Sequence, residues 1–302
     1  MNFTKSKPKV ALGTKSWGGV GQTEIENVFD LAMEHGLNLW DTADSYAEGD
    51  SEETLGEFVR NVNREDIIIS AKFTPDDANS EISDAGAVQE MFNRSMNRMN
   101  IDYADIYWLD NSDDVQRWIP ALLHLARCGQ IGEIGLADHS LEGIKKASDV
   151  LNQAGIKVAG VQNHFSLLSR TKEVYDILNY CKENDMTFYA YRVLEQGALS
   201  GDYDKLHPFA EGSKRADTYN NLLPQMEVLL EKMREIGREK DISAAQVAIA
   251  WAISKGTLPI IGVTKVKHVE DCVNASKVQL TDEEITELED LADQAGVNTL
   301  AD

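Results

Sequence analysis

The stretch Leu37-Asn38-Leu39-Trp40-Asp41-Thr42-Ala43-Asp44-Ser45-Tyr46 sets the pattern from which the fold of the chain follows. Residues 37–40 are a short apolar run after a helical segment that Gly36 would end, so we expect a buried strand with Asp41 at its carboxyl end. The next apolar run, residues 67–71, ends at Lys72. If the helix expected over residues 51–61 joins two neighbouring parallel strands, Asp41 and Lys72 emerge at the same rim of a sheet.

Asp41, Tyr46 and Lys72 are the residue types of a proton-transfer site. An unperturbed tyrosine, with a pKa near ~10, is a poor acid at neutral pH, but a nearby lysine ammonium favours the phenolate. An aspartate beside the lysine would keep it charged and fixed. Each residue alone has a structural explanation as a turn cap, a packed ring or a solvated cation. Their joint placement favours general acid–base catalysis.

The same pattern of a short apolar run and a helix recurs along the whole chain. Eight such units, mostly about 25 to 35 residues apart, predict a single-domain (β/α)8 TIM barrel over residues 1–302, with a doubly wound open sheet as the alternative. Catalytic residues of such barrels lie at the carboxyl ends of the strands. In this sequence those ends carry Thr14, Asp41, Lys72, Asp110, Asp138, Gln162, Tyr191 and Gly262.

Two capping boxes and one irregular segment complete the predicted architecture. Thr23 with Glu26 predicts the start of a helix that runs to His35, and Thr281 with Glu284 predicts the start of a C-terminal helix. Residues 201–221 are polar and lack clear periodicity. A segment of that length predicts a functional lid loop.

Composition narrows the classes of function. The net charge of −22 argues against nucleic acid and anionic membranes as partners, because both would be repelled. Three isolated cysteines, no signal peptide in residues 1–9 and no membrane-spanning apolar run predict a cytoplasmic protein. The six histidines show no metal-ligand spacing, so we expect no metal site. The oligomeric state is not predicted.

Four ordered segments resemble the aldo-keto reductase family over nearly the whole length of the chain. They are residues 41–46 followed by 51–56, residues 162–170, residues 196–201 and residues 261–265. The resemblance implies an NADP(H)-dependent, or NAD(H)-dependent, oxidoreductase that transfers a hydride to a small-molecule carbonyl substrate. It also implies that Tyr46 donates the proton, that Lys72 lowers the pKa of Tyr46 and that Asp41 anchors Lys72.

The resemblance assigns further residues to the cofactor. Tyr191 would stack on the nicotinamide, and Gln162 would hydrogen-bond its carboxamide. The loop after the seventh strand would wrap the pyrophosphate, and residues 262–271 would hold the adenosine end, where a helix expected to start at Thr264 offers an anion site. Lys265, Lys267 and His268 would offer positive charge to a 2'-phosphate. The full set of expected cofactor residues is Thr14, Asp41, Asp138, Gln162, Tyr191, Arg192, Leu194, Gly197, Leu199, Gly201, Gly262, Thr264, Lys265, His268 and Asp271.

The chain departs from the family pattern at the fourth strand, where Asp110 stands in place of the family histidine. An ionised carboxylate only accepts hydrogen bonds, whereas a desolvated, protonated one can donate. Three readings stay open: carbonyl reduction that depends on Tyr46, reduction of a conjugated C=C bond assisted by protonated Asp110, and a cofactor-binding or sensor module with little turnover.

Three smaller departures concern the cofactor, namely Ala137-Asp138, Arg192-Val193 and Cys272. Arg192 could pair with Asp110, clamp an acidic group of the substrate, or point outward. We expect the substrate site to contain Trp17, Tyr46, Asp110 and Arg192.

Overall fold

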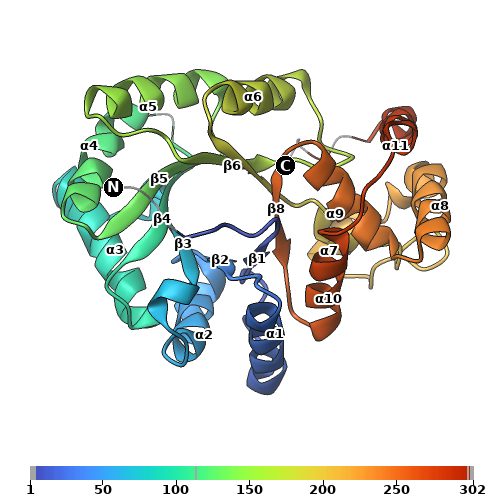
Figure 1. Cartoon of the computed structure of the whole chain (residues 1–302), viewed down its shortest axis with the longest axis horizontal. Helices are drawn as coiled ribbons and strands as arrows, with labels where there is room; N and C mark the ends of the chain where they lie inside the picture. Colours follow the sequence, from blue (N-terminus) through green and yellow to red (C-terminus); the bar gives the residue numbers. More distant parts are fainter. Residues whose placement is uncertain (1–4, 113, 298, 300–302) are drawn as a thin grey trace.

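The computed structural model describes residues 5–112, 114–297 and 299. Eight parallel strands close into a barrel in chain order, and the helices form a ring outside it (Figure 1). The strands are β1 (Ala11–Gly13), β2 (Leu39–Asp41), β3 (Ile68–Phe73), β4 (Ala104–Asp110), β5 (Ile131–Ala137), β6 (Gly160–His164), β7 (Thr187–Tyr191) and β8 (Leu258–Gly262). The predicted barrel is confirmed, and the open-sheet alternative is wrong.

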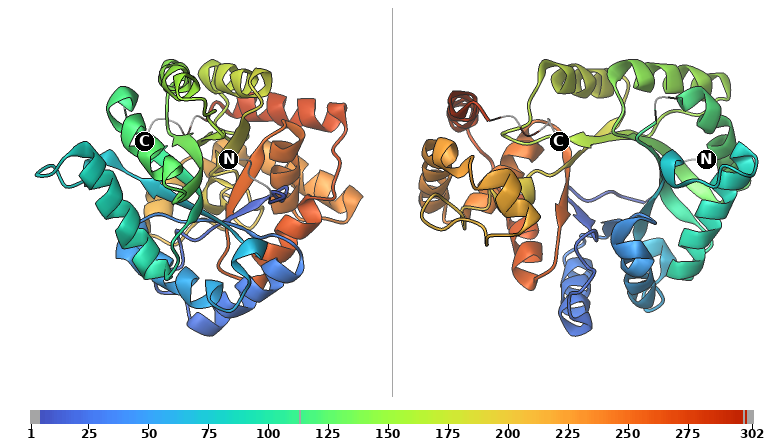
Figure 2. Two further views of the ribbon diagram at one scale, coloured as in Figure 1. Left: turned by 60° about the vertical axis from the view of Figure 1, so that its left-hand side comes forward. Right: turned by 180° about the vertical axis from the view of Figure 1, so that it is seen from behind.

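Eleven α-helices occur in the described part of the chain. They are α1 (Gln22–Glu34), α2 (Asp50–Val59), α3 (Asp84–Met99), α4 (Val115–Arg127), α5 (Leu141–Gln153), α6 (Lys172–Glu183), α7 (Lys214–Tyr219), α8 (Leu223–Lys240), α9 (Ala244–Ser254), α10 (Val266–Ala275) and α11 (Asp282–Ala295). Helices α8 and α11 pack side by side outside α9 (Figures 1 and 2). The predicted capping box of Thr281 and Glu284 opens α11, so the C-terminal helix is confirmed.

The barrel interior is filled by a compact cluster of side chains that includes Trp108 and Tyr189, whose rings meet edge to face at 5.0 Å. Two glycines make room for these rings. A Cβ on Gly135 would lie 2.2 Å from the Trp108 ring, and one on Gly160 would lie 2.8 Å from the Tyr189 ring. The interior is therefore a packed core, and in such barrels the chemistry lies at the carboxyl ends of the strands.

The amino-terminal end of the barrel is closed by ion pairs. Asp105, near the start of β4, is 1% exposed and bonds to Lys5 at 2.7 Å and to Arg64 at 2.6 Å. The Ile69 amide also donates to Asp105, at 2.8 Å. Nearby, Lys7 bonds to Glu133 at 2.7 Å.

Two expected helix starts are wrong. Helix α1 begins at Gln22 with the extended residue Gly21 as its N-cap, so Thr23 already lies within the first turn and forms no side-chain cap. Helix α10 begins at Val266 because Lys265 is extended, with φ −144° and ψ 150°. Both shifts arise because the backbone conformation of the preceding residue, not the side-chain pattern, decides where a helix starts.

Residues 201–221, expected to form an irregular lid, contain α7 and an apolar cluster. Phe209 is 2% exposed and stacks on Tyr203 with ring centroids 3.8 Å apart, and Tyr219 is 1% exposed. The segment is therefore anchored by buried rings that its polar composition did not reveal.

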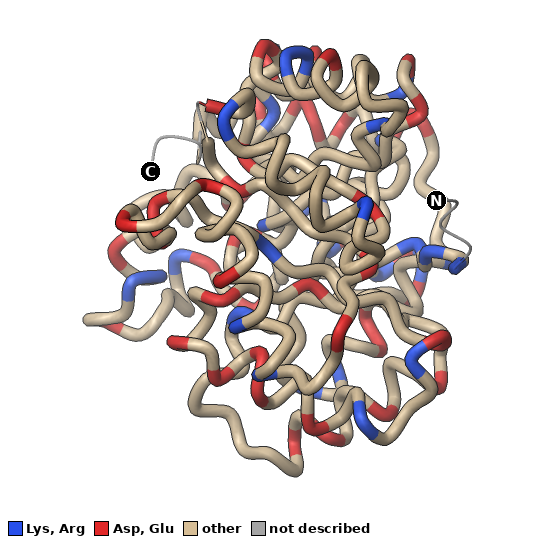
Figure 3. Tube along the Cα trace, turned by 90° about the vertical axis from the view of Figure 1, so that its left-hand side faces the viewer, with Lys and Arg blue, Asp and Glu red and all other residues tan. Residues whose placement is uncertain are grey.

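Acidic residues recur along the visible Cα trace, with basic residues between them (Figure 3). Among the described residues, no helix has the length and apolarity that a bilayer crossing requires.

Candidate active site

Asp41, Lys72 and Gln162 converge at the carboxyl end of the barrel. The Lys72 ammonium lies 3.0 and 2.8 Å from the two carboxylate oxygens of Asp41 and donates to Gln162 Oε1 at 2.8 Å. Gln162 Nε2 closes the triangle by donating to Asp41 Oδ1 at 3.0 Å. All three are nearly buried, at 3 to 4% exposed. The strands β2, β3 and β6 thus place one anion, one cation and one amide in mutual contact.

A second set of hydrogen bonds holds Asp41 from inside the barrel. Ser70 Oγ donates to Asp41 Oδ1 at 2.8 Å, and Trp108 Nε1 donates to Ser70 Oγ at 2.5 Å. Burial opposes the charge of Lys72, but Asp41 outweighs it and keeps the pKa of Lys72 above its usual value. Lys72 is therefore a fixed ammonium at neutral pH.

Tyr46 lies in a short 3-10 turn, η1 (Tyr46–Gly49), that follows β2. Ala47 and Glu48 in this turn have left-handed φ values of 51° and 56°, so the turn needs support from its surroundings. That support comes from the preceding Asp44, which forms ion pairs of 2.5 Å with both Arg94 and Arg98 of α3. The acidic residue of the predicted signature thus has a structural role in the turn that carries Tyr46.

The Tyr46 ring faces the Lys72 ammonium, which lies 5.8 Å from the ring centroid. Burial raises the pKa of Tyr46 to about 12, because it outweighs the charge and hydrogen bonding of Lys72, which lower it. Asp41 and Asp110 raise the pKa further. Lys72 therefore lowers the pKa of Tyr46 as expected, but burial outweighs its effect.

Lys15 is a mouth residue that the sequence analysis missed. Its ammonium lies 5.5 Å from the Tyr46 ring centroid, on an exposed side chain just after β1. Partial desolvation of the Lys15 ammonium, followed by the charges of Arg192 and Lys72, lowers the pKa of Lys15, while Asp110 and Asp138 raise it. Its place directly after Thr14, at a predicted strand end, was a signal that could have identified it.

Asp110 ends β4 and is half-buried, and Thr74 Oγ1 donates to it at 3.2 Å. Burial raises the pKa of Asp110 above its usual value, although Lys72 and Thr74 act in the opposite direction. Within the described residues, no ion pair joins Asp110 to Arg192, so of the alternatives considered for Arg192 the pairing with Asp110 is wrong. Arg192 adopts a left-handed φ of 55°, and its charge acts on Asp138, Tyr191 and Lys15 instead.

Tyr191, at the end of β7, is held on two sides. Its hydroxyl donates to Asp138 Oδ1 at 2.6 Å, and its ring stacks on His164 with centroids 5.5 Å apart and an interplanar angle of 19°. Burial and the neighbouring Asp138 carboxylate raise the pKa of Tyr191. The ring is therefore neutral and fixed at the rim.

The loop after β7 has an unusual backbone. Arg192, Glu195 and Gln196 are non-glycine residues with positive φ, and Gly197 has φ 107°. The Glu195 carboxylate is fully buried and bonds to His164 Nε2 at 2.7 Å. Of the loop residues expected to wrap the pyrophosphate, Leu194 and Gly197 are half-buried and Leu199 is fully buried. Gly201 closes the loop against α9, where a Cβ would lie 2.7 Å from Ala244.

The segment from Gly262 to Asp271 contains exposed residues as well as side chains that are hydrogen-bonded within the protein. Gly262 is exposed with free space around its Cα, and Lys265 and Lys267 are exposed. The Thr264 amide donates to His268 Nδ1 at 3.2 Å, and burial lowers the pKa of His268. His268 is therefore neutral at neutral pH and does not supply the positive charge expected of it.

Three expected site residues are turned into the protein. Trp17 is 3% exposed, its ring packs on Trp40 at 5.5 Å, and its Nε1 donates to Val263 O at 2.7 Å, so the indole belongs to the core rather than to an open substrate pocket. Thr14 is fully buried, and its hydroxyl donates to Asp41 O at 3.1 Å, which ties β1 to β2. Asp271 is 5% exposed and accepts from Ser243 and Gln246.

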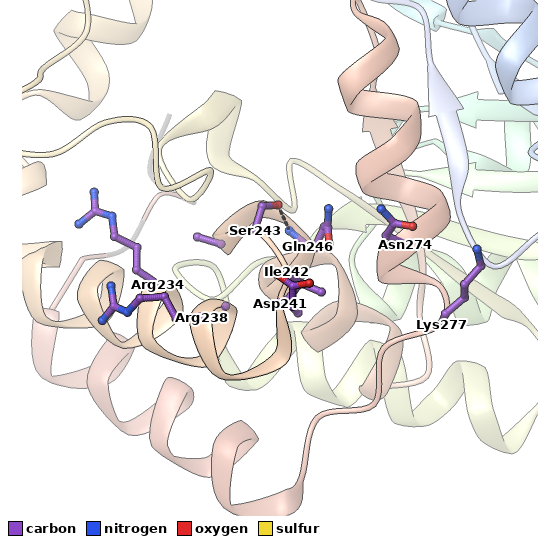
Figure 4. A pocket seen from close by; sticks show the side chains of 10 residues that line it. Arg234, Arg238, Asp241, Ile242, Ser243, Gln246, Asn274 and Lys277 are labelled. Atoms are coloured by element: carbon purple, nitrogen blue, oxygen red, sulfur yellow. Dashed lines mark hydrogen bonds between the residues drawn. The ribbon is translucent and has the colours of Figure 1, made fainter.

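A hollow of about 760 Å³ opens in the outer helical layer (Figure 4). Its wall comes from α8, α9 and α10 and includes Arg234, Arg238 and Lys277. Ser243 and Gln246, which donate to Asp271, also lie in this wall. The hollow therefore borders the segment expected to hold adenosine but contains none of the mouth residues. In the described part of the chain, no group of three or more histidine, cysteine or acidic residues is placed to hold a metal ion.

A closed parallel barrel with a tyrosine, a lysine and an aspartate together at its carboxyl end defines the class of protein: a (β/α)8 barrel with ionisable side chains where such barrels carry their chemistry. A model described as "Aldo/keto reductase family" matches residues 9–293, and the chain belongs to this family of oxidoreductases.

Relatives and solved structures agree with this assignment. The chain is 30% identical over 304 residues to the chloroplastic pyridoxal reductase of Arabidopsis thaliana, with 93% of this chain and 82% of the relative covered. The glycerol dehydrogenase of Gluconobacter oxydans has the same fold, with a TM-score of 0.84, 21% identity and coverage of 97% and 94%. An aldo/keto reductase of Klebsiella pneumoniae solved with NADP and acetate gives a TM-score of 0.75, 24% identity and coverage of 95% and 92%.

Proposed function

We propose that this protein is an NADP(H)-dependent reductase of aldehydes or ketones in which Tyr46 is the general acid. The observation that carries the proposal is the fixed Asp41–Lys72 pair beside the Tyr46 ring, at the open end of the barrel. A phenol is a weak acid, so it needs a neighbouring cation to stabilise the negative charge that develops when its proton leaves.

A nicotinamide, when bound, would supply or accept the hydride. Tyr46 transfers its hydroxyl proton to the carbonyl oxygen as negative charge develops there, and Lys72 stabilises the phenolate that remains. Asp41 and Gln162 hold the Lys72 ammonium so that its charge is in place before the reaction. In the reverse direction the Tyr46 phenolate accepts the proton of an alcohol.

The residues present fit a nicotinamide dinucleotide. Tyr191 is a fixed neutral ring at the rim, and it precedes the loop after β7, whose backbone is left-handed at Arg192, Glu195 and Gln196. The N-cap of α10, Lys265, forms no side-chain hydrogen bond to the first turn, which leaves this helix N-terminus without a competing cap for an anion. Exposed Lys265 and Lys267 lie at this helix start and support NADP(H) over NAD(H) as the cofactor, as does the NADP bound to the Klebsiella pneumoniae relative.

The decisive experiment is Tyr46→Phe. We expect kcat/KM for aldehyde reduction to fall by about 10³-fold, while the dissociation constant for NADPH stays within about twofold, because the lost hydroxyl contacts the substrate and not the cofactor. Tyr103→Phe, at the opposite end of the barrel, is the matched control. Wild-type turnover in Tyr46→Phe, or no NADPH oxidation by the wild type with any carbonyl of a broad panel, would contradict the proposal; the latter result with tight NADPH binding favours a cofactor-binding module.

A second candidate function is reduction of a C=C bond conjugated to a ketone, and the raised pKa of half-buried Asp110 favours it. A protonated Asp110 could donate a hydrogen bond to the carbonyl oxygen and so activate the conjugated bond. Product analysis with an enone separates the candidates: carbonyl reduction gives the allylic alcohol, and C=C reduction gives the saturated ketone.

A further inference from the structure

The Glu195 carboxylate collects hydrogen bonds from four separate parts of the chain. His164 Nε2, at the end of β6, bonds to Oε1 at 2.7 Å, and Thr299 Oγ1, near the C-terminus, donates to the same oxygen at 2.9 Å. Ser166 Oγ also donates to Oε1, and the Tyr219 hydroxyl of α7 donates to Oε2 at 2.9 Å. Glu195 therefore joins β6, the loop after it, α7 and the C-terminal segment.

Glu195 remains charged despite its burial. The residue is 0% exposed, and burial alone would raise the pKa of its carboxyl. The hydrogen bonds from His164, Ser166 and Thr299 outweigh burial and hold the pKa of Glu195 below its usual value. A buried carboxylate in this state is costly to displace, because all of its donors would lose their partner at once.

The backbone around Glu195 needs such an anchor. Glu195 and Gln196 have φ values of 45° and 53°, and Arg192 has φ 55°, in the left-handed region that non-glycine residues disfavour. Two backbone bonds close this turn, from Glu195 N to Arg192 O and from Gly197 N to Leu194 O, each 2.8 Å long. Because the turn is strained, it keeps its shape only while surrounding contacts hold it.

The same carboxylate reaches the Tyr191 ring through one intermediate. His164, bonded to Glu195 at 2.7 Å, stacks on Tyr191 with centroids 5.5 Å apart. On its other side, the Tyr191 hydroxyl is bonded to Asp138. Glu195 thus supports the backbone of the loop after β7 and, through His164, one face of the Tyr191 ring.

We propose that Glu195 is a positioning residue for the dinucleotide: it fixes the loop of residues 192–201 and the Tyr191 ring in their binding geometry. The inference rests on the proposed function, because it assigns that loop and ring to the cofactor. Glu195 acts through its neighbours and does not itself contact the cofactor. Thr299 and the Tyr219 hydroxyl of α7 extend the same support, so these two residues contribute to cofactor affinity from outside the mouth.

The test is the dissociation constant of NADPH, measured by fluorescence titration of the full chain with Glu195→Gln. Glutamine keeps the acceptor for His164, Ser166 and Thr299 but removes the charge and turns an amide towards Tyr219. We expect NADPH binding to weaken by about tenfold, while kcat at saturating NADPH stays within about twofold. Thr299→Val and Tyr219→Phe each remove one donor and leave the carboxylate, so we expect about threefold weaker binding from each.

Asp105→Asn is the matched control, because Asp105 is also a buried carboxylate with three donors but lies at the other end of the barrel. It should lower the melting temperature and leave NADPH binding unchanged. Wild-type NADPH affinity in Glu195→Gln overturns the inference, as does an equal loss of affinity in Asp105→Asn. If Glu195→Gln fails to fold, wild-type affinity in both Thr299→Val and Tyr219→Phe overturns it. Failure of the wild type to bind NADPH would refute the proposed cofactor, and the inference with it; wild-type binding that is merely insensitive to position 195 refutes the inference alone.

Discussion

Two buried aspartates, each bonded to a lysine, lie at opposite ends of the same barrel. Their comparison shows what distinguishes an ion pair suited to proton transfer from one that only stabilises the fold. Asp105 bonds to Lys5 at 2.7 Å and to Arg64 at 2.6 Å, and its second oxygen also accepts from a backbone amide. Asp41 bonds to Lys72 at 2.8 Å. The first pair closes the amino-terminal end of the barrel, whereas the second lies beside a phenol at the open end.

The difference between the two pairs lies in the group next to each lysine, not in the number of its hydrogen bonds. The Lys5 ammonium donates hydrogen bonds to Asp105 and to the backbone carbonyls of Arg64 and Ile67. Lys72 bonds to Asp41 and Gln162, and its charge still acts on Tyr46, whose pKa it lowers. Both ammonium groups therefore have three hydrogen-bonded acceptors, and what distinguishes the pair suited to proton transfer is the ionisable phenol beside Lys72.

The largest expected difference between the two ends of the barrel is the loss of activity when the lysine of each pair is replaced. We expect Lys72→Met to lower kcat/KM for carbonyl reduction by about 10³-fold, because Tyr46 loses the cation that stabilises its phenolate. Lys5→Met should leave kcat/KM within about twofold. Steady-state kinetics on both variants provides the measurement. Equal losses of activity would mean that the two pairs do not differ in function.

A second comparison concerns stability. We expect Asp105→Asn to lower the free energy of unfolding by about 3 kcal/mol, because Lys5 and Arg64 lose a shared buried anion. Its kcat/KM at a temperature where it is folded should match the wild type. Urea unfolding followed by circular dichroism measures the loss. A stable Asp105→Asn variant with impaired catalysis would reverse the assignment of the two ends.

The smallest expected effect concerns pH: ionisation of Tyr46 should cause no fall in kcat/KM in the mildly basic range. The Tyr46 phenol has a pKa of about 12, so it stays protonated at every lower pH and loses its proton only as the pH rises towards that value. For reduction, which needs the protonated phenol, kcat/KM of the free enzyme should therefore not decline between pH 8 and 10 on account of Tyr46. A basic limb centred near pH 9 that disappears in Tyr46→Phe would show that the phenol is far more acidic than its surroundings imply.

Much of the rim could be predicted because local rules place it. Strand ends follow from apolar runs and helix stops, and parallel strands of a barrel bring all their carboxyl ends to one face. That was enough to place Asp41, Lys72 and Gln162 together, although they lie up to 121 residues apart. It was also enough to place Tyr191 and Asp110 at the same rim.

Other features depend on which way a side chain turns, which strand ends do not decide. Trp17 and Thr14 follow the same strand as Lys15, yet the first two are buried and Lys15 is exposed. The Glu195 cluster joins residues as far apart as Thr299, 104 positions away, and no periodicity in the chain marks such a contact.

The sequence by itself determined the barrel, the order of its strands and the identity of the polar groups at its mouth, because short-range hydrophobic periodicity and chain connectivity are written directly in the residues. Only the tertiary structure decided the ionisation of those groups and the support of the loop after β7. Tyr46 shows the reason: its pKa is the balance between burial, which the whole fold produces, and the charge of Lys72, which a neighbouring strand provides.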